Sequence, residues 1–371
     1  MISGSQSQKP LIALFSSTLA GGGAERVLVN LAHGLCDRGY PVDVVLASAK
    51  GEFLSELPKS VRVFDLQASR VVRSILPLAR YLRRQRPHSL LAFQDHANVA
   101  AIWANFIART DTKIVASVHS MWSRSMKESA HRGKLRFLAG LTTQAYKYAS
   151  AVVAVSSGVA GDLVETIGIK PESVSVIYNP VITPQLLARS NATLVHPWFN
   201  SGEPPVVFGM GRLSPEKDFP TLLRAFAKVR LQFPVRLMIL GEGAGRHELE
   251  DLAAQLGVTD DVIFPGFVAN PYPYLKRAGV FVLSSRYEGL PTVLIEALAL
   301  GVPCVATDCK SGPSEILANG RHGDLVPVGD VNAIASAIVA ALQRSRTPAP
   351  ASAWEPFTLS AATDAYERVL A

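Results

Sequence analysis

The sequence has few cysteines, no Asp-x-Asp pair and no long apolar segment, and each absence excludes a class of protein. Its three cysteines, Cys36, Cys304 and Cys309, form no CxxC pair and no even-numbered framework, which indicates reduced thiols in a cytoplasmic protein. Apolar stretches such as residues 297–306 contain glycine and proline and stay below the roughly 18 residues that a membrane-spanning helix needs. No cluster of His and Glu has metal-binding spacing, so we expect no bound metal.

Length and charge then suggest two domains of different character. A chain of 371 residues, with 48% apolar and 18% charged residues, is long enough for two globular domains. The net charge of +7 is uneven, because residues 1–190 hold 22 Lys and Arg against 12 Asp and Glu, whereas residues 191–371 hold 15 against 18. The first half is therefore the basic half.

The basic residues of the first half concentrate in two segments that read as amphipathic helices. Such helices attract anionic lipid headgroups, phosphate-bearing acceptors or nucleic acid, although an ordinary solvated helix surface has the same composition. The two clusters are Arg70, Arg73, Arg80, Arg83, Arg84 and Arg86, and Arg124, Lys127, Arg132, Lys134 and Arg136.

Short apolar, β-branched runs alternate with longer helical stretches along the whole chain. This alternation is typical of an α/β protein with doubly wound parallel sheets. The pattern pauses after residue 178, where a polar stretch follows, and then starts again near residue 206. We therefore expect an N-terminal Rossmann-like domain over residues 1–178, a C-terminal one over 179–345, a ligand cleft between them, and a linker with a final helix over 346–371 that packs back on the first domain.

Three consecutive glycines, Gly21 to Gly23, follow the first expected strand and lead into a helix. Glycines let backbone N–H groups approach a ligand, and the helix N-terminus adds partial positive charge, so the loop suits an anion such as phosphate. A tight turn is the alternative, although one glycine usually suffices for that. The spacing is not GxGxxG and no acidic residue ends the second strand, which argues against a dinucleotide.

Two segments of the second half carry groups that suit a nucleotide sugar. Arg212 can hold two phosphate oxygens, and Lys217 adds a charge on the same loop. Glu288 lies in a loop, and Glu296 lies in an apolar helix expected to start at Pro291, where a carboxylate needs a hydrogen-bond partner such as a sugar hydroxyl. Glu296 follows Glu288 by eight positions, which would span about 12 Å if helical. Surface charges, a helix cap and an ion pair are the alternatives.

Taken together, these segments resemble the retaining glycosyltransferases of family 4, which have the two-domain GT-B fold. The resemblance rests on Glu-x7-Glu at Glu288 and Glu296, Gly-Arg-Leu-x-x-x-Lys with Arg212 and Lys217, the glycine loop, and Asn179-Pro180. It implies catalytic roles for His119, Glu288, Arg212 and Lys217. It also implies donor contacts from Gly22, Gly23, Arg212, Lys217, Glu288, Gly289, Leu290, Pro291, Thr292 and Glu296.

The resemblance implies a retaining, metal-independent hexosyltransferase without a cofactor. We expect transfer of a hexose or N-acetylhexosamine from a nucleotide diphosphate sugar, most often a UDP-sugar, to a lipid-linked saccharide in surface polysaccharide or glycan biosynthesis. The basic half predicts peripheral attachment to the inner face of the cytoplasmic membrane. We expect no nucleic-acid partner, because mere adhesion would not require the set of Arg212, Lys217, Glu288 and Glu296. The alternatives are a GT-B-fold nucleotide-sugar epimerase, a transferase that uses GDP-mannose or a soluble acceptor, and a non-catalytic protein that binds nucleic acid or membrane. A Ser-His-Asp hydrolase is disfavoured because no G-x-S-x-G occurs.

Overall fold

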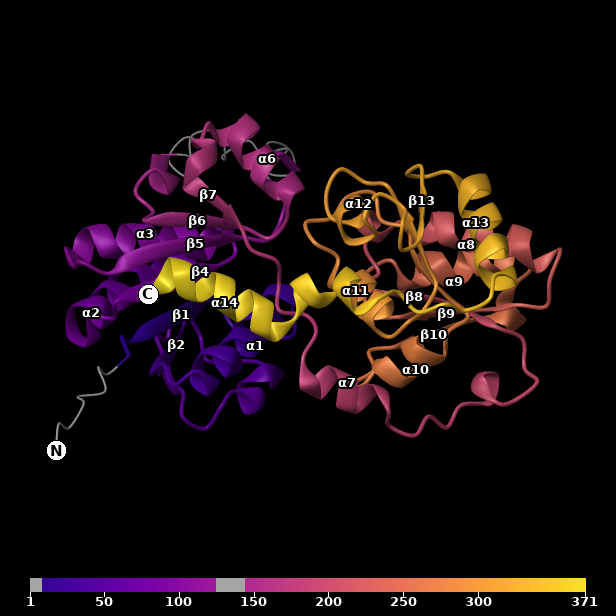
Figure 1. Ribbon diagram of the computed structural model, residues 1–371, viewed down its shortest axis with the longest axis horizontal. Coiled ribbons are helices and arrows are strands. Elements are labelled where there is room, and N and C mark those ends of the chain that lie inside the picture. Colours follow the sequence, from indigo (N-terminus) through magenta and orange to yellow (C-terminus); the bar gives the residue numbers. More distant parts are fainter. Residues whose placement is uncertain (1–8, 125–143) are drawn as a thin grey trace. The chain divides into compact units, whose positions relative to one another are not determined.

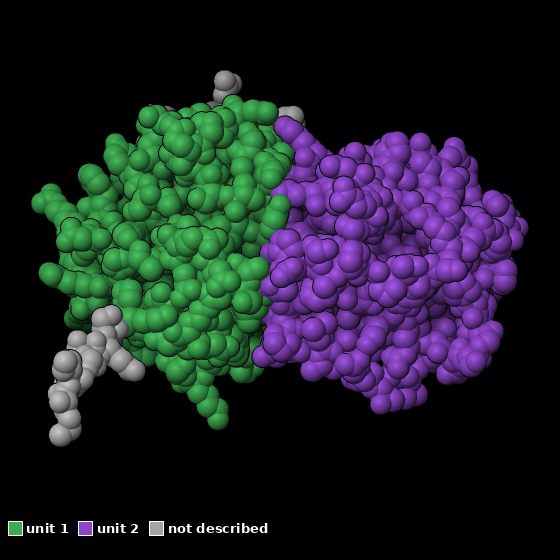
Figure 2. All heavy atoms as spheres, in the orientation of Figure 1, with its two compact units in different colours: residues 1–180, 359–371 green, residues 181–358 purple. Residues whose placement is uncertain are grey.

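A computed structural model describes residues 9–124 and 144–371 of the chain. It divides into two compact units (Figures 1 and 2): unit 1 comprises Met1–Pro180 with Leu359–Ala371, and unit 2 comprises Val181–Thr358. The first boundary lies two residues after the expected one. Residues 346–358, which we grouped with the final helix, belong to unit 2.

Unit 1 contains a parallel sheet of seven strands in the order β3-β2-β1-β4-β5-β6-β7. All five residues of β1 are buried because helices cover both faces of the sheet, which explains its uninterrupted apolar sequence. The order of the strands reverses between β1 and β4, so the loops that follow these two strands leave the sheet side by side. The strands are β1 Ile12–Ser16, β2 Val42–Leu46, β3 Arg62–Asp65, β4 Ser89–Phe93, β5 Lys113–Val118, β6 Ala151–Ala154 and β7 Val174–Val176.

Among the described residues, one apolar cluster of the unit 1 core lies on each face of the sheet. Ile12 and Leu14 of β1 belong to the cluster with α1 and α14, whereas Ala13 and Phe15 belong to the cluster with α2 and α3. This division follows from the alternation of side chains along a strand. The α-helices of this unit are α1 Gly23–Asp37, α2 Ile75–Gln85, α3 Asp95–Ala108, α6 Ser157–Ile167 and α14 Leu359–Leu370, and its short 3-10 helices are η1 Glu52–Glu56, η2 Val71–Ser74 and η3 Pro171–Ser173.

The C-terminal helix α14 is part of the unit 1 core. Its side chains Tyr366 and Leu370 are fully buried in the same cluster as the apolar face of α1. A side chain at Gly34 of α1 would overlap Thr363, so glycine is what allows the two helices to approach closely.

Unit 2 contains a second parallel sheet, of six strands in the order β10-β9-β8-β11-β12-β13. Its order reverses between β8 and β11. The strands are β8 Val206–Met210, β9 Arg236–Leu240, β10 Val262–Gly266, β11 Val280–Leu283, β12 Cys304–Thr307 and β13 Asp324–Val326.

Helices cover the sheet of unit 2, and one apolar cluster of its core lies between α8, α13 and the sheet. The α-helices are α7 Pro184–Ser190, α8 Phe219–Arg230, α9 Arg246–Gln255, α10 Tyr272–Arg277, α11 Thr292–Ala299, α12 Pro313–Ile316 and α13 Val331–Gln343. The 3-10 helices are η4 Pro197–Phe199, η5 Pro215–Lys217, η6 Thr259–Asp261, η7 Ala351–Ala353 and η8 Glu355–Phe357. Two doubly wound parallel-sheet units confirm the predicted fold class. Within the described ranges, no helix combines the length and the apolar character that a membrane crossing requires.

Candidate active site

The predicted donor-binding residues of unit 2 follow its two central strands. Arg212 and Lys217 lie in the loop after β8, and Glu288 lies in the loop after β11. Since β8 and β11 are the neighbours at which the strand order reverses, their carboxyl ends form the edge where parallel sheets bind ligands. The fold thus brings together residues that are distant in the sequence.

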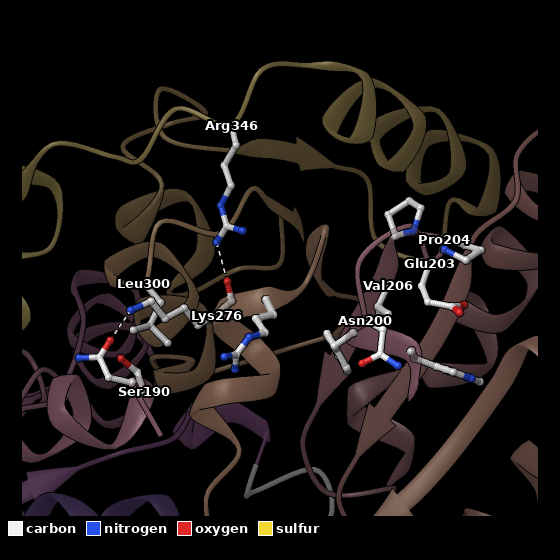
Figure 3. A pocket seen from close by; sticks show the side chains of 13 residues that line it. Ser190, Asn200, Glu203, Pro204, Val206, Lys276, Leu300 and Arg346 are labelled. Carbon is white, nitrogen blue, oxygen red and sulfur yellow. Dashed lines mark hydrogen bonds between the residues drawn. The ribbon is translucent and has the colours of Figure 1, made fainter. Parts of the chain in front are cut away.

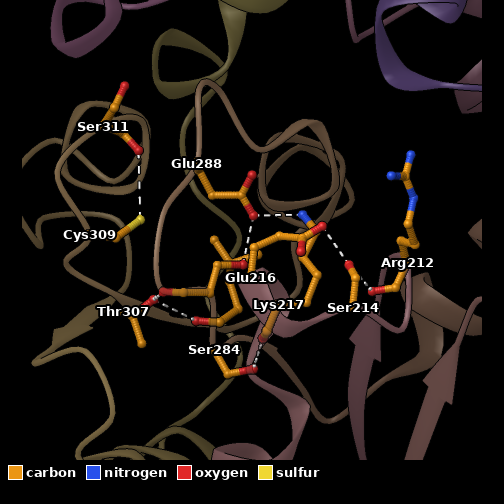
Figure 4. A network of polar contacts seen from close by, with 11 residues as sticks. Arg212, Ser214, Glu216, Lys217, Ser284, Glu288, Thr307, Cys309 and Ser311 are labelled. Carbon is orange, nitrogen blue, oxygen red and sulfur yellow. Dashed lines mark hydrogen bonds and ion pairs between the residues drawn. The ribbon is translucent and has the colours of Figure 1, made fainter. Parts of the chain in front are cut away.

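Lys217 and Glu288 contact each other directly (Figure 4). Lys217 Nζ donates a hydrogen bond of 2.6 Å to Glu288 Oε1, and the same oxygen accepts a second bond of 2.6 Å from Ser285 Oγ. Both charged side chains are largely buried, with 19% and 12% of their surface exposed. We predicted that each residue contacts the donor, and the ion pair between them is an additional finding.

Arg212 differs from Lys217 in both exposure and partners. Its side chain is exposed and extends away from the Glu288 network in Figure 4. None of the carboxylates in residues 9–124 and 144–371 forms an ion pair with it. Its guanidinium is therefore available to an external anion, whereas Lys217 already has a carboxylate partner.

Small hydroxyl side chains fix the loops that carry these charges. Ser284 Oγ donates to the Lys217 carbonyl at 2.7 Å, and Thr307 Oγ1 donates to the Ser285 carbonyl at 2.5 Å. Ser311 Oγ donates to the Gly289 carbonyl at 2.8 Å. Residues of these types occur throughout the sequence, so no sequence signal distinguished these three.

A second ion pair connects the same two loops. Arg286 Nε lies 3.1 Å from Asp218 Oδ2, and Asp218 has a left-handed backbone with φ of 48°. The carboxylate is 2% exposed, whereas the guanidinium is 59% exposed. The interaction with Asp218 raises the pKa of Arg286 above its usual value. Asp218 and Arg286 are the immediate neighbours of Lys217 and Ser285, so this pair limits how far the loops can separate.

Helix α11 begins one residue later than we predicted. Pro291 has an extended backbone with ψ of 100° and precedes the first helical residue, Thr292. The 12 Å span between Glu288 and Glu296 assumed a continuous helix, and the loop before Thr292 makes that assumption wrong. Leu290 and Pro291 are buried, whereas Thr292 and Glu296 are partly exposed.

Cys309 lies beside this network without being a nucleophile. Burial raises the pKa of its thiol to about 12, and the negative charge of Glu288 acts in the same direction. The group is therefore a neutral thiol at physiological pH.

The glycine loop of unit 1 holds a carboxylate of its own. Gly22 precedes α1, and a side chain there would overlap the Glu25 carboxylate, which folds back over the start of the helix and is 7% exposed. A phosphate bound at this loop would lie next to that carboxylate. The arrangement favours a neutral, hydroxyl-bearing ligand at Gly22 over the phosphate that the glycines alone suggested.

Gln94 connects the loops that follow β1 and β4, the two strands at which the order of the unit 1 sheet reverses. Its amide donates to Glu25 Oε1 at 3.4 Å and accepts from Ser17 Oγ at 3.4 Å. Gln94 has φ of 77° and ψ of 147°, a region that glycine normally occupies. Strained residues concentrate at functional sites, and neither Gln94 nor Glu25 was among our predicted site residues.

His119 follows β5 and is also at the carboxyl edge of the unit 1 sheet. Its Nε2 lies 3.0 Å from Ser117 Oγ, which in turn lies 3.4 Å from the hydroxyl of Tyr366 in α14. Burial lowers the pKa of His119 to about 4, so the imidazole is neutral at pH 7. A neutral imidazole can exchange hydrogen bonds with a sugar or phosphate but supplies no positive charge.

A cavity of about 570 Å³ occurs in unit 2, away from these residues (Figure 3). It lies at the amino end of β8, where Val206, Leu300, Lys276 and Arg346 contribute to its wall. Parallel sheets bind ligands at the opposite edge. The cavity contains none of the predicted site residues.

Two remaining expectations concern metal and charge. Among the described residues, no three side chains of His, Cys, Asp or Glu come together as a metal site. Of the second basic cluster only Arg124 is described, because Lys127, Arg132, Lys134 and Arg136 lie outside the described residues.

Comparison with known proteins identifies the family. Residues 194–352 match the family described as Glycosyl transferases group 1, and residues 21–184 match Glycosyltransferase Family 4. The lipopolysaccharide core biosynthesis glycosyltransferase LpsE of Rhizobium meliloti is 30% identical over 361 residues, which cover 94% of this chain and 96% of that protein. A Campylobacter jejuni protein named N-acetylgalactosamine-N,N'-diacetylbacillosaminyl-diphospho-undecaprenol 4-alpha-N-acetylgalactosaminyltransferase is 26% identical over 336 residues, with 87% of each chain covered.

Solved structures show the same fold. Anabaena HepE in complex with UDP and glucose superposes with a TM-score of 0.77 at 24% identity, covering 97% of this chain and 99% of that one. The lipopolysaccharide outer core galactosyltransferase WaaB has a TM-score of 0.73 at 19% identity with the same coverage. The chain therefore belongs to glycosyltransferase family 4, within the glycosyl transferases of group 1, and is a glycosyltransferase of the GT-B fold.

Proposed function

We propose that this enzyme transfers a hexose or N-acetylhexosamine from a UDP-sugar to a lipid-linked saccharide, with retention of configuration at the anomeric carbon. The observation that carries the proposal is the pair of loops after β8 and β11, which present Arg212, Lys217 and Glu288 at one edge of the unit 2 sheet. A nucleotide sugar needs cations for its diphosphate and carboxylates for its hydroxyls, and this edge has both.

In the reaction, the bond between the anomeric carbon and the β-phosphate oxygen breaks, the acceptor hydroxyl oxygen forms the new bond to the anomeric carbon, and the hydroxyl proton passes to the leaving diphosphate. Negative charge grows on the leaving diphosphate, where Arg212 and Lys217 stabilise it without a metal ion. Glu288 accepts hydrogen bonds from the transferred sugar, and Glu296 accepts them from the ribose. The neutral His119 contributes a hydrogen bond near the donor sugar.

Relatives support the choice of acceptor. The name of one relative places it in lipopolysaccharide core biosynthesis, and the name of another gives a diphospho-undecaprenol-linked substrate. In this chain, Glu25 and Gln94 provide hydroxyl-binding groups in unit 1. The proposed pathway is therefore surface polysaccharide or glycan synthesis at the cytoplasmic face of a membrane.

A transfer assay with UDP-glucose, UDP-galactose, their N-acetylated counterparts and GDP-mannose tests the proposal. We expect UDP release that depends on a lipid-linked saccharide, persists in EDTA and yields a product with the anomeric configuration of the donor. Arg212→Ala should lower kcat by about 10²–10³-fold without changing the melting temperature, since Arg212 is exposed. Arg321→Ala, at another exposed arginine of unit 2, serves as the control.

Other results of the assay would contradict the proposal. An epimerised sugar formed without acceptor would indicate the epimerase. Activity that EDTA abolishes and manganese restores would contradict the metal-independent role of the two cations. Transfer only to a small soluble glycoside would contradict the proposed acceptor, and transfer only from GDP-mannose would contradict the proposed donor. Neither result would contradict glycosyl transfer itself.

A further inference from the structure

Helices α2 and α3 of unit 1 carry a surface with an unusual charge pattern. Residues 66–94 contain six arginines and no Asp or Glu, and residues 96–110 add Arg109 and again no acidic residue. The only carboxylate between residues 66 and 110 is Asp95, which lies at the amino end of α3. We call the exposed side chains of residues 70–86 and 103–109 the α2–α3 face.

In the part of the chain that the structure describes, the arginines of this face have no acidic partners. Arg83 joins the two helices, because its Nε and Nη2 donate to the carbonyls of Ala108 and Ile107 at 3.2 and 2.6 Å. Arg73 Nη1 donates to Ser69 Oγ at 3.0 Å. Within the described residues no carboxylate forms an ion pair with any arginine of the face, namely Arg70, Arg73, Arg80, Arg83, Arg84, Arg86 and Arg109. Their positive charge is therefore not neutralised by this part of the protein.

Large apolar side chains are exposed among these arginines. Val72 and Phe106 are each 67% exposed, Leu76 is 58% exposed and Ile107 is 37% exposed. Leu76 and Arg80 are four residues apart on α2, so they lie on one side of the helix. The α2–α3 face thus carries exposed apolar groups at both ends of the helix pair among arginines, which differs from apolar side chains scattered singly over a surface.

We propose that the α2–α3 face docks on an anionic lipid surface, with Leu76 and Phe106 reaching the boundary of the acyl chains and the arginines contacting the headgroup phosphates. This inference rests on the proposed function only for the presence of a membrane-bound acceptor. Basic charge with exposed apolar tips is the composition of interfacial helices, and a nucleic-acid surface would not require the apolar tips.

The direction of α2 agrees with this proposal. In a parallel sheet each helix starts at the carboxyl edge and ends at the amino edge, so Val72 and Leu76 lie near the edge of unit 1 that carries Gln94 and His119, whereas Phe106 at the end of α3 lies near the other edge. The α2–α3 face therefore runs along the length of both helices. The lipid surface would thus extend from the side where we place the acceptor. A saccharide attached to a lipid through a diphosphate could be bound there while its lipid remains in the membrane.

Sedimentation with vesicles of pure phosphatidylcholine, or with about one third phosphatidylglycerol, tests the proposal. Wild-type protein should bind the anionic vesicles in low salt and less well at 0.5 M NaCl, because salt screens exposed charges. Loss of each arginine contact should weaken binding by about fivefold, so Arg80→Glu with Arg84→Glu should reduce it by at least 25-fold. Phe106→Ser with Leu76→Ser should reduce the binding that remains in high salt.

Matched controls come from unit 2. Arg321→Glu changes the net charge as Arg80→Glu does, and Leu231→Ser removes a side chain that is 88% exposed, so neither should change vesicle binding. The thermal shift produced by UDP should stay unchanged in all variants, which separates this inference from the proposed donor site. The inference is wrong if the wild-type protein does not bind anionic vesicles in low salt. It is also wrong if the variant with Arg80→Glu and Arg84→Glu binds them as tightly as the wild type does. Preferential binding of an oligonucleotide over the vesicles also overturns it.

Discussion

Lys217 and Glu288 are held 2.6 Å apart although 71 residues of sequence separate them. A diphosphate that binds Lys217 has to share the ammonium with this carboxylate. Glu288→Gln should therefore tighten UDP binding by several-fold, since it removes the competing charge, and should lower kcat by at least 10²-fold because the sugar loses its acceptor. Calorimetric titration with UDP and a transfer assay measure the two effects.

Lys217→Ala should have the opposite effect on UDP binding. It removes a cation and leaves the Glu288 carboxylate largely buried without it, so affinity and kcat should both fall. Glu250→Gln on α9 is the control for Glu288→Gln, because it also removes a carboxylate from an ion pair, the exposed pair with Arg246, and it should leave UDP binding unchanged. If the wild type, Lys217→Ala and Glu288→Gln bind UDP with equal affinity, then neither Lys217 nor Glu288 influences binding of the diphosphate.

The Asp218–Arg286 pair should contribute to the stability of the donor-binding loops. Arg286→Gln leaves a buried carboxylate without its cation, and we expect a loss of about 1–2 kcal/mol in the free energy of unfolding, since the guanidinium is exposed to solvent. Adding Asp218→Asn should recover most of the loss, because Asn also tolerates a left-handed backbone. Urea unfolding of the two single variants and the double variant measures the coupling, and purely additive losses would contradict it.

His119 should make the protein less stable in acid. Burial lowers its folded pKa to about 4 from 6.5, so between these values the unfolded chain binds more protons than the folded one. Stability therefore falls as the pH drops through this window, by about 2 kcal/mol between pH 7 and pH 5. Asp95 acts in the opposite direction, because burial raises its pKa to about 6.

Comparing wild type with His119→Gln isolates this effect, since Asp95 is present in both. The unfolding free energy of each protein is measured in urea at pH 7 and at pH 5. On going from pH 7 to pH 5, the wild type should lose about 2 kcal/mol more than His119→Gln. A difference that is independent of pH would mean that the imidazole is already charged or solvated in the folded protein.

Gln94 has a backbone that glycine would adopt more easily, and we attribute its presence to ligand binding. Gln94→Gly should raise the unfolding free energy by about 1 kcal/mol while raising KM for the acceptor by at least tenfold. Gln67→Gly is the matched control, because Gln67 also has a positive φ, of 53°, but lies exposed after β3. That control should leave KM unchanged. A Gln94→Gly enzyme with the KM of the wild type would show that the strain has no role in acceptor binding.

The sequence predicted the central strands of both sheets and both edge strands of unit 2, β10 and β13, but missed both edge strands of unit 1. Strands such as β1 and β8 are buried on both faces and therefore read as continuous apolar runs. Strands β3 and β7 lie at the edges of the unit 1 sheet, and most of their residues are partly or fully exposed, so neither has such a run. Burial of both faces makes a strand easiest to recognise, although β10 and β13 were recognised from shorter apolar runs with partly exposed residues.

For the site, residue types were easier to predict than contacts. Arg212, Lys217, Glu288 and Glu296 stand out because charge recurs in glycine-containing loops and in an apolar helix. The ion pair between Lys217 and Glu288 depends on the neighbouring positions of β8 and β11, which only the sheet order reveals. Glu25 did carry a signal, since an acidic residue in the first turn of a helix commonly interacts with its N-terminus, but the glycines suggested phosphate instead.

The position of α14 reverses the order in which the two units can be completed during synthesis. Unit 2 is one continuous segment, Val181–Thr358, and its whole sequence has been made before residue 359 is added. The larger segment of unit 1 precedes unit 2 in the chain, but it lacks Tyr366 and Leu370 of its core until residues 359–371 have left the ribosome. The apolar side of α1 therefore stays uncovered until α14 has been synthesised. Unit 2 can thus finish folding before unit 1, although most of unit 1 is synthesised earlier.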